Sequence, residues 1–99
     1  MRMARIAIEK THHMSHKKAK EAAEKVAGDL KKRFELDYCW QGDAIEFKRP
    51  GLTGLLHVGK EDVRLDCELG LMLSLLKPTI ENAVHKEFDK YFGRPKGKT

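Results

Sequence analysis

Three histidines near the start of the chain are the first candidates for chemistry. His12, His13 and His16 lie close together, and the spacing of four between His12 and His16 can bind a divalent metal when both lie on one helix. No carboxylate or cysteine separates or directly flanks them, and His12 and His13 precede the residue at which we expect the helix to begin. We therefore interpret them as solvated side chains at a helix entrance, and we expect neither a metal nor another cofactor.

The two cysteines are the next candidates. Strand alternation places Cys39 outward and Cys67 inward, so the pleat does not favour a disulfide between them. We interpret Cys67 as a small core residue, and Cys39 lacks a sequence-adjacent base that would mark a nucleophile. The first residues contain no apolar run typical of a signal peptide, so we expect free thiols in the reducing cytoplasm.

Charged side chains of both signs alternate with apolar ones along most of the expected strands. We expect them on one solvated face of a sheet, where they form cross-strand pairs. A catalytic pair of carboxylates would need a pocket, and the sequence has no Gly-rich phosphate-binding loop, so we do not expect an enzyme. The residues assigned to this face are Arg5, Asp37, Glu46, Lys48, Arg49, His57, Arg64, Asp66 and Glu68.

A period of two predicts the strands that position these residues. They cover residues 3–9, 36–41, 44–49, 52–58 and 63–69, and short turns join the last four into an antiparallel meander. In each of the five strands one face is apolar. Such a face must be covered by another layer.

A period of three to four predicts two helices that can form this layer. Ser15 is the expected N-cap of the first helix, and Pro78 fits the first turn of the second, which Gly93 ends. The apolar stripe of the first helix consists of Ala19, Ala22, Ala23, Val26, Ala27, Leu30 and Phe34. The stripe of the second consists of Leu76, Ile80, Val84, Phe88 and Tyr91 or Phe92.

These elements predict an α+β fold of the order β-α-β-β-β-β-α, with a curved antiparallel sheet and two helices packed on one face. Residues 1–93 form one domain, with the first strand at an edge of the sheet, and residues 94–99 form a basic disordered tail. The net charge of +5 falls to +2 without the tail, since 17 basic residues then face 15 acidic ones. This balance does not favour a nucleic-acid surface.

The most apolar run, residues 69–76, lies where the sheet pattern ends and the second helix begins. One helical stripe can bury Leu73 and Leu76, but it cannot also bury Leu71, Met72 and Leu75. These three side chains need a second partner, which is the rest of the domain, a second copy in a homodimer, or a lipid-like or polymer surface. The run is too short to form a transmembrane helix.

Aromatic and basic residues supply two further candidate surfaces. Tyr38 and Trp40 share the inner face with Leu36, and we interpret them as core residues because no basic residues interleave with them there. The first helix is rich in lysine, which three acidic residues dilute, so a solvated face is the simpler interpretation and an anionic partner the alternative. The lysines that represent this surface are Lys17, Lys18, Lys25 and Lys32.

The order and spacing of several short motifs resemble those of one bacterial family. The motifs are Ile6-Ala7-Ile8, Trp40-Gln41-Gly42-Asp43, Phe47-Lys48-Arg49 with Gly51 and Gly54, Val63-Arg64-Leu65-Asp66, Leu69-Gly70, Leu75-Leu76-Lys77 and Ile80-Glu81. The chain is similar to the polyhydroxyalkanoic acid system proteins, also called polyhydroxyalkanoate granule-region proteins. The resemblance implies an association with polyester storage granules, and it carries over no enzymatic role and no catalytic residue.

We therefore expect a non-enzymatic, cytoplasmic accessory protein that contacts the granule surface or a granule-associated protein. Leu71, Met72 and Leu75 would form the contact, and lysines of the first helix would help at an anionic surface. One alternative is a carrier that encloses an acyl chain between the sheet and the second helix. A less favoured alternative is a nucleic-acid-binding regulator that uses the basic tail and the first helix.

Overall fold

The computed structural model describes residues 4–92, so the expected tail at residues 94–99 lies outside it. Its elements are β1 (Ala4–Thr11), α1 (His16–Phe34), β2 (Asp37–Gln41), β3 (Ala44–Arg49), β4 (Leu52–Val58), β5 (Asp62–Leu69), the short 3-10 helix η1 (Leu73–Leu76) and α2 (Lys77–Phe92). The predicted order and the α+β class are confirmed. The addition is η1, which forms from the apolar run before the second helix.

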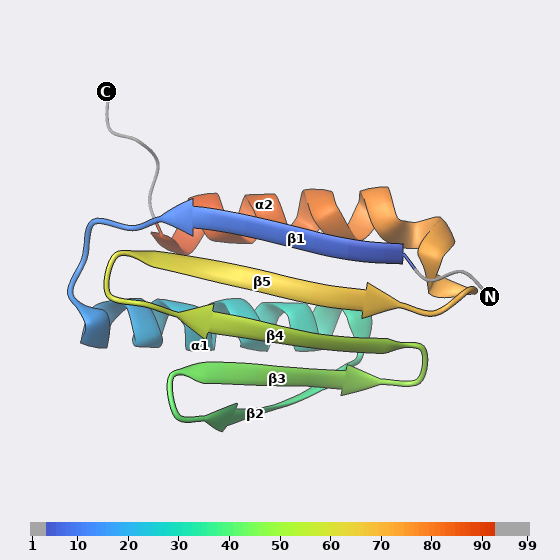
Figure 1. Ribbon diagram of the computed structural model, residues 1–99, viewed down its shortest axis with the longest axis horizontal. Coiled ribbons are helices and arrows are strands. Elements are labelled where there is room, and N and C mark those ends of the chain that lie inside the picture. The colour runs from blue at the N-terminus through green and yellow to red at the C-terminus, as the bar shows by residue number, and fades with distance from the viewer. Residues whose placement is uncertain (1–3, 93–99) are drawn as a thin grey trace.

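The five strands form one antiparallel sheet in the order β1-β5-β4-β3-β2 (Figure 1). β1 lies at an edge, as predicted, and its partner is β5. Because register is set by which side chains must face the core, one apolar row crosses all five strands without a break. The row consists of Ile8, Leu65, Leu56, Ile45 and Trp40.

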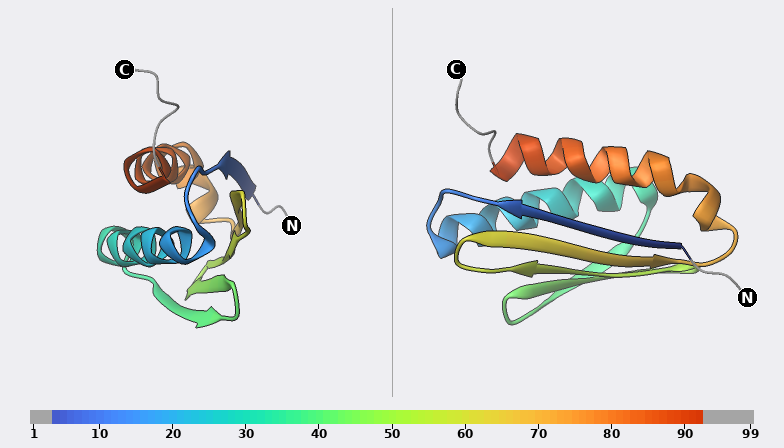
Figure 2. Two further views of the ribbon diagram at one scale, coloured as in Figure 1. Left: turned by 90° about the vertical axis from the view of Figure 1, so that its left-hand side faces the viewer. Right: turned by 45° about the horizontal axis from the view of Figure 1, so that its top comes forward.

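Both helices cover the same face of the sheet and leave the other face open (Figure 2). In α1 every residue of the predicted stripe from Ala19 to Leu30 is buried, and Phe34 is half-buried. Ser15 caps the helix as predicted, since its hydroxyl accepts a hydrogen bond from the Lys18 N–H at 3.1 Å. The four alanines of the stripe keep its side chains short, so the helix axis can lie close to the sheet.

The buried stripe of α2 differs from the prediction at its start. It consists of Ile80, Ala83, Val84, Phe88 and Phe92. Leu76 was expected to belong to it, but its side chain is 43% exposed. The reason is that Leu76 lies on η1, a 3-10 helix at the end of the sheet, so the α-helical stripe of α2 does not extend back to it (Figure 1).

Arg49 was assigned to the outer face of the sheet, and this assignment is wrong. Alternation along β3 places it with Ile45 and Phe47 on the inner side. Its guanidinium donates a hydrogen bond to the carbonyl of Phe34, the last residue of α1. Arg49 therefore ties the end of the first helix to β3.

Cross-strand pairing on the outer face is confirmed for one ion pair. The Arg5 guanidinium lies 3.1 Å from Asp66 Oδ1, between the edge strand β1 and its neighbour β5. Both side chains are more than half exposed, so the pair contributes little stability.

Two carboxyl groups meet where α1 and α2 pack together. The Tyr91 hydroxyl on α2 donates a hydrogen bond to Asp29 Oδ2 on α1 at 2.9 Å. Hydrogen bonds from Glu87 and Tyr91 lower the pKa of Asp29, whereas burial and the hydrogen bond to Asp29 raise the pKa of Glu87. The two carboxyl groups therefore influence each other across the helix contact, and Glu87 holds its proton more tightly than Asp29 does.

The sign of the pH dependence follows from these directions. Glu87 contributes fully to the free energy of unfolding when the pH is below its pKa in the unfolded chain. This contribution is lost as the pH rises through its raised pKa in the folded protein. Asp29 contributes to the free energy of unfolding when the pH is above its pKa in the unfolded chain. This contribution is lost as the pH falls through its lowered pKa in the folded protein. The pair therefore stabilises the helix contact most in mildly acidic solution, between the two folded pKa values.

We predict that Glu87→Gln stabilises the fold at about pH 7.5 by up to about 1 kcal/mol, because the neutral amide removes a charge beside Asp29 and can donate a hydrogen bond to it. Near the mildly acidic optimum the variant should match the wild type. Urea unfolding at several pH values measures this difference. Glu81→Gln on the same helix is the matched control, and an equal gain in both variants would show that general charge repulsion is the cause.

Candidate functional site

The predicted contact residues Leu71, Met72 and Leu75 lie on the surface at one end of the domain. Their side chains are 66%, 86% and 85% exposed, and that of the neighbouring Leu76 is 43% exposed. We call these four residues the apolar patch. They lie on η1 and in the turn before it, between the end of β5 and the start of α2 (Figure 1).

Local contacts of the turn hold the apolar patch outward. The Gly70 N–H donates to the Gly51 carbonyl at 2.7 Å, and the Ser74 N–H donates to the Gly70 carbonyl at 2.9 Å. The Ser74 hydroxyl donates to the Leu71 carbonyl at 2.7 Å. Leu73 is half-buried and packs over Gly51, where a Cβ would be in van der Waals contact with Leu73 Cδ1 at 3.4 Å. Leu73 is therefore the side chain of η1 that anchors the turn.

The exposure of the apolar patch is concentrated and not a general property of the surface. Within residues 4–92, five large apolar side chains are exposed, and four of them form the patch. The fifth, Leu55, lies on the open face of the sheet and is 45% exposed. Contiguous exposed apolar groups of this kind are typical of contact surfaces.

The lysines singled out on the first helix do not form one surface with the apolar patch. Lys17, Lys18, Lys25 and Lys32 are all exposed. Lys17 and Lys18 belong to the first turn of a 19-residue helix, which is roughly 28 Å long. The chain enters α1 at the end away from η1, so only Lys32, in the last turn, lies at the same end as the patch (Figure 1).

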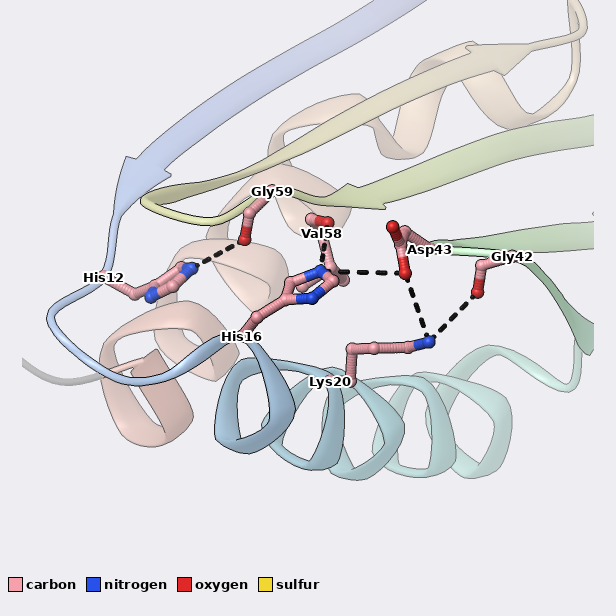
Figure 3. Close-up of polar contacts among 7 residues, drawn as sticks. All are labelled: His12, His16, Lys20, Gly42, Asp43, Val58 and Gly59. Carbon is pink, nitrogen blue, oxygen red and sulfur yellow. Dashed lines mark hydrogen bonds and ion pairs between the residues drawn. The ribbon is translucent and has the colours of Figure 1, made fainter.

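The histidines are placed differently from the prediction of a solvated helix entrance. His12 is 3% exposed, and its Nε2 lies 3.1 Å from the Gly59 carbonyl (Figure 3). Its Nδ1 accepts a hydrogen bond from the Met14 N–H. With Nδ1 as the acceptor, Nε2 is the nitrogen that donates to the Gly59 carbonyl. His12 joins the end of β1 to the turn between β4 and β5. It was misread because its partner, Gly59, is 47 residues away.

His16 makes a parallel contact to the same turn. Its Nε2 lies 3.2 Å from the Val58 carbonyl and 3.7 Å from Asp43 Oδ1 (Figure 3). The Lys20 ammonium lies 3.2 Å from the same oxygen and 3.3 Å from the Gly42 carbonyl. The residues drawn in Figure 3 contain no hydroxyl or thiol nucleophile. The geometry fits a clamp that fastens the start of α1 to two turns of the sheet.

Trp40 lines an open groove of about 830 Å³ between α1 and the β2–β3 hairpin, and Tyr38 lies two residues before Trp40 on β2. Both rings are half-buried against the core. The Tyr38 hydroxyl and the Trp40 indole N–H each donate a hydrogen bond of 2.7 Å to the Glu24 carboxylate. The hydrogen bond to Glu24, followed by burial, raises the pKa of Tyr38. The Lys20 ammonium lies 5.1 Å from the centre of the Trp40 ring. The expectation that no basic residue accompanies these rings is therefore wrong, because Lys20 and Lys31 reach them from α1 and not from the strand.

The cysteines lie as predicted. Both are free, Cys39 is exposed and Cys67 is buried. Burial, together with the charges of Asp66 and Glu68, raises the pKa of the Cys67 thiol to about 11. Cys67 therefore stays protonated at neutral pH and behaves as a small apolar residue.

The interior offers little room for a ligand. A cavity of about 20 Å³ lies between the two helices and the sheet, lined by residues such as Leu30, Phe47 and Val84. This volume is about that of one water molecule. An acyl chain could enter only if the helices moved apart.

No three or more histidine, cysteine or acidic side chains among residues 4–92 lie close enough to hold a metal ion together. In the same part of the chain, neither helix is long and apolar enough to cross a bilayer.

We predict that His12→Ala lowers the free energy of unfolding by about 2 kcal/mol or more, because it leaves a cavity and removes the partner of the Gly59 carbonyl. The neighbouring His13 is exposed, so His13→Ala should change it by roughly 0.5 kcal/mol or less. Urea unfolding of both variants, with and without added zinc, measures this. A zinc-dependent stabilisation that both variants lose would instead identify the histidines as metal ligands.

The family comparison covers every element that builds the apolar patch. A family model described as "putative polyhydroxyalkanoic acid system protein" matches residues 6–92, from β1 to the last residue of α2. Comparison with curated proteins and with solved structures gave no match. The chain therefore belongs to the family of putative polyhydroxyalkanoic acid system proteins, as the order of its motifs predicts.

Proposed function

We propose that this protein is a non-enzymatic accessory factor that binds the surface of polyhydroxyalkanoate granules through the apolar patch. The observation that carries the proposal is the exposure of Leu71, Met72, Leu75 and Leu76 at one end of a compact fold. The family name supplies the polyhydroxyalkanoate context. The proposal places the protein in the cytoplasm, where such a granule surface would be its partner.

The size of the patch suits reversible binding. Complete burial of one leucine or methionine side chain contributes about 1.5–3 kcal/mol, so three such side chains give roughly 4–9 kcal/mol before the costs of association. After those costs, a single copy binds weakly through this surface alone. The protein would therefore exchange between granule and solution unless a second contact assists.

Self-association is the alternative use of the same surface. A homodimer that buries the patch would leave it unavailable to granules, and the mass of the protein in solution distinguishes the two. The carrier alternative has less support, because the interior cavity of about 20 Å³ is too small for an acyl chain. The nucleic-acid alternative depends mainly on residues 94–99, which lie outside the described residues.

We predict that simultaneous substitution of Leu71, Met72 and Leu75 by serine reduces co-sedimentation with isolated polyhydroxyalkanoate granules at least about tenfold, since it removes most of the apolar contact area. The wild type should still bind granules at high salt, because salt does not weaken apolar contacts. Unfolding by urea should be nearly unchanged, because the three side chains are exposed.

Leu55→Ser is the matched control, since it removes the exposed apolar side chain outside the patch. It should bind granules like the wild type. The proposal is wrong if the triple variant sediments with granules as well as the wild type does. If the wild type is a stable dimer that does not co-sediment with granules, and the triple variant is a monomer, the patch serves self-association.

A further inference from the structure

A second feature lies beside the apolar patch and is not explained by packing. An open cleft of about 400 Å³ lies between the last turn of α1 and the first half of α2, which run antiparallel (Figure 2). Arg33 and Phe34 line it from α1, and Thr79, Asn82, Ala83 and Lys86 line it from α2. Its volume is that of a small-molecule site.

The polar groups of the cleft are hydrogen-bond donors without an acid among them. Arg33 and Lys86 carry positive charges, and Thr79 and Asn82 add a hydroxyl and an amide. No ion pair between residues 4 and 92 involves Arg33 or Lys86. Glu87 follows Lys86 and lies near both Asp29 and Arg33, and the charge of Arg33 opposes the rise in its pKa, but it forms no ion pair with Arg33 among the described residues. Two cations with neutral donors form a set that suits a phosphate group.

The cleft begins directly after the apolar patch along the chain. Leu75 and Leu76 lie at the end of η1, α2 begins at Lys77, and the exposed cleft residues Thr79, Asn82 and Lys86 follow one another on one face of α2. A surface that contacts Leu75 therefore lies next to the near end of the cleft. Apolar side chains beside basic ones are the arrangement with which proteins bind anionic lipid surfaces.

We propose that this cleft binds the phosphate of an anionic phospholipid headgroup, while the apolar patch inserts beside it. The inference rests on the proposed function, since it assumes that this end of the molecule faces a surface. It supplies the second contact that weak apolar binding requires. It also gives the surface a chemical identity, a phospholipid layer rather than bare polyester.

The test compares two double variants of equal charge. Arg33→Gln with Lys86→Gln removes the cations of the cleft, and Lys18→Gln with Lys60→Gln removes two exposed lysines away from it. Binding is measured by co-sedimentation with phosphatidylglycerol vesicles and with phosphatidylcholine vesicles. We expect the wild type to prefer phosphatidylglycerol, and the cleft variant to lose about 25-fold, since one basic residue at an anionic surface contributes about a fivefold change. The control should retain most of the wild-type affinity.

A second measurement separates the lipid from free phosphate. Inorganic phosphate at high concentration should shift the Asn82 side-chain amide signals in NMR spectra of the wild type and not of the cleft variant. Free phosphate should bind far more weakly than vesicles do, because it gains nothing from the patch. If it binds as tightly as vesicles, the ligand is a soluble phosphate and the lipid assignment is wrong.

Three further results would overturn the inference. Equal losses in the cleft variant and the control would show that only total charge matters. Equal binding to the two kinds of vesicle would show that the cleft does not recognise an anionic headgroup, because phosphatidylcholine carries a phosphate but no net charge. Binding to a DNA duplex that depends on Arg33 and Lys86 as strongly as vesicle binding would identify the cleft as a nucleic-acid site.

The failure of this inference is distinguishable from the failure of the proposed function. Granule binding that depends on Leu71, Met72 and Leu75 but not on the cleft supports the proposed function and overturns the inference. Vesicle binding that depends on the cleft, without any binding to granules, overturns the proposed function and leaves the phospholipid site in place.

Discussion

The structure depends on the burial of one apolar face of a five-stranded antiparallel sheet. A single layer, formed by the two helices, covers that face. The chain must therefore pass from the sheet to the helix layer between the end of β5 and the start of α2. The connection lies at the end of the sheet, where neither layer covers it. Apolar residues in this connection therefore stay exposed, and the patch follows from the topology as much as from the local sequence.

Much of the fold was predictable because two periods dominate the sequence. Alternation along the strands placed Cys39 outward and Cys67 inward, and the spacing of the alanines gave the buried stripe of α1. Two errors came from where the patterns end. Arg49 follows the inner face of β3 to its last residue, and Leu76 precedes the α-helix on a 3-10 turn, so a helical stripe extended back to it fails.

The candidate site was only partly predictable. That Leu71, Met72 and Leu75 point away from the stripe of the second helix follows from helix geometry, and the structure leaves all three exposed. The roles of His12, Lys20 and the donors of the cleft depend on partners far away in sequence. Lys20 and Glu24 share a face of α1 with a spacing of four, a pattern that could have pointed to their common position above Trp40.

Footprinting of Met72 on granules tests the central claim most directly. Its side chain is 86% exposed in the free protein, whereas Met14 is partly buried against the core. A brief pulse of peroxide converts an accessible methionine to its sulfoxide, which mass spectrometry counts at each position. If the patch binds granules, oxidation of Met72 should slow severalfold on granules while that of Met14 stays the same. Unchanged oxidation of Met72 in granule-bound protein would contradict the account.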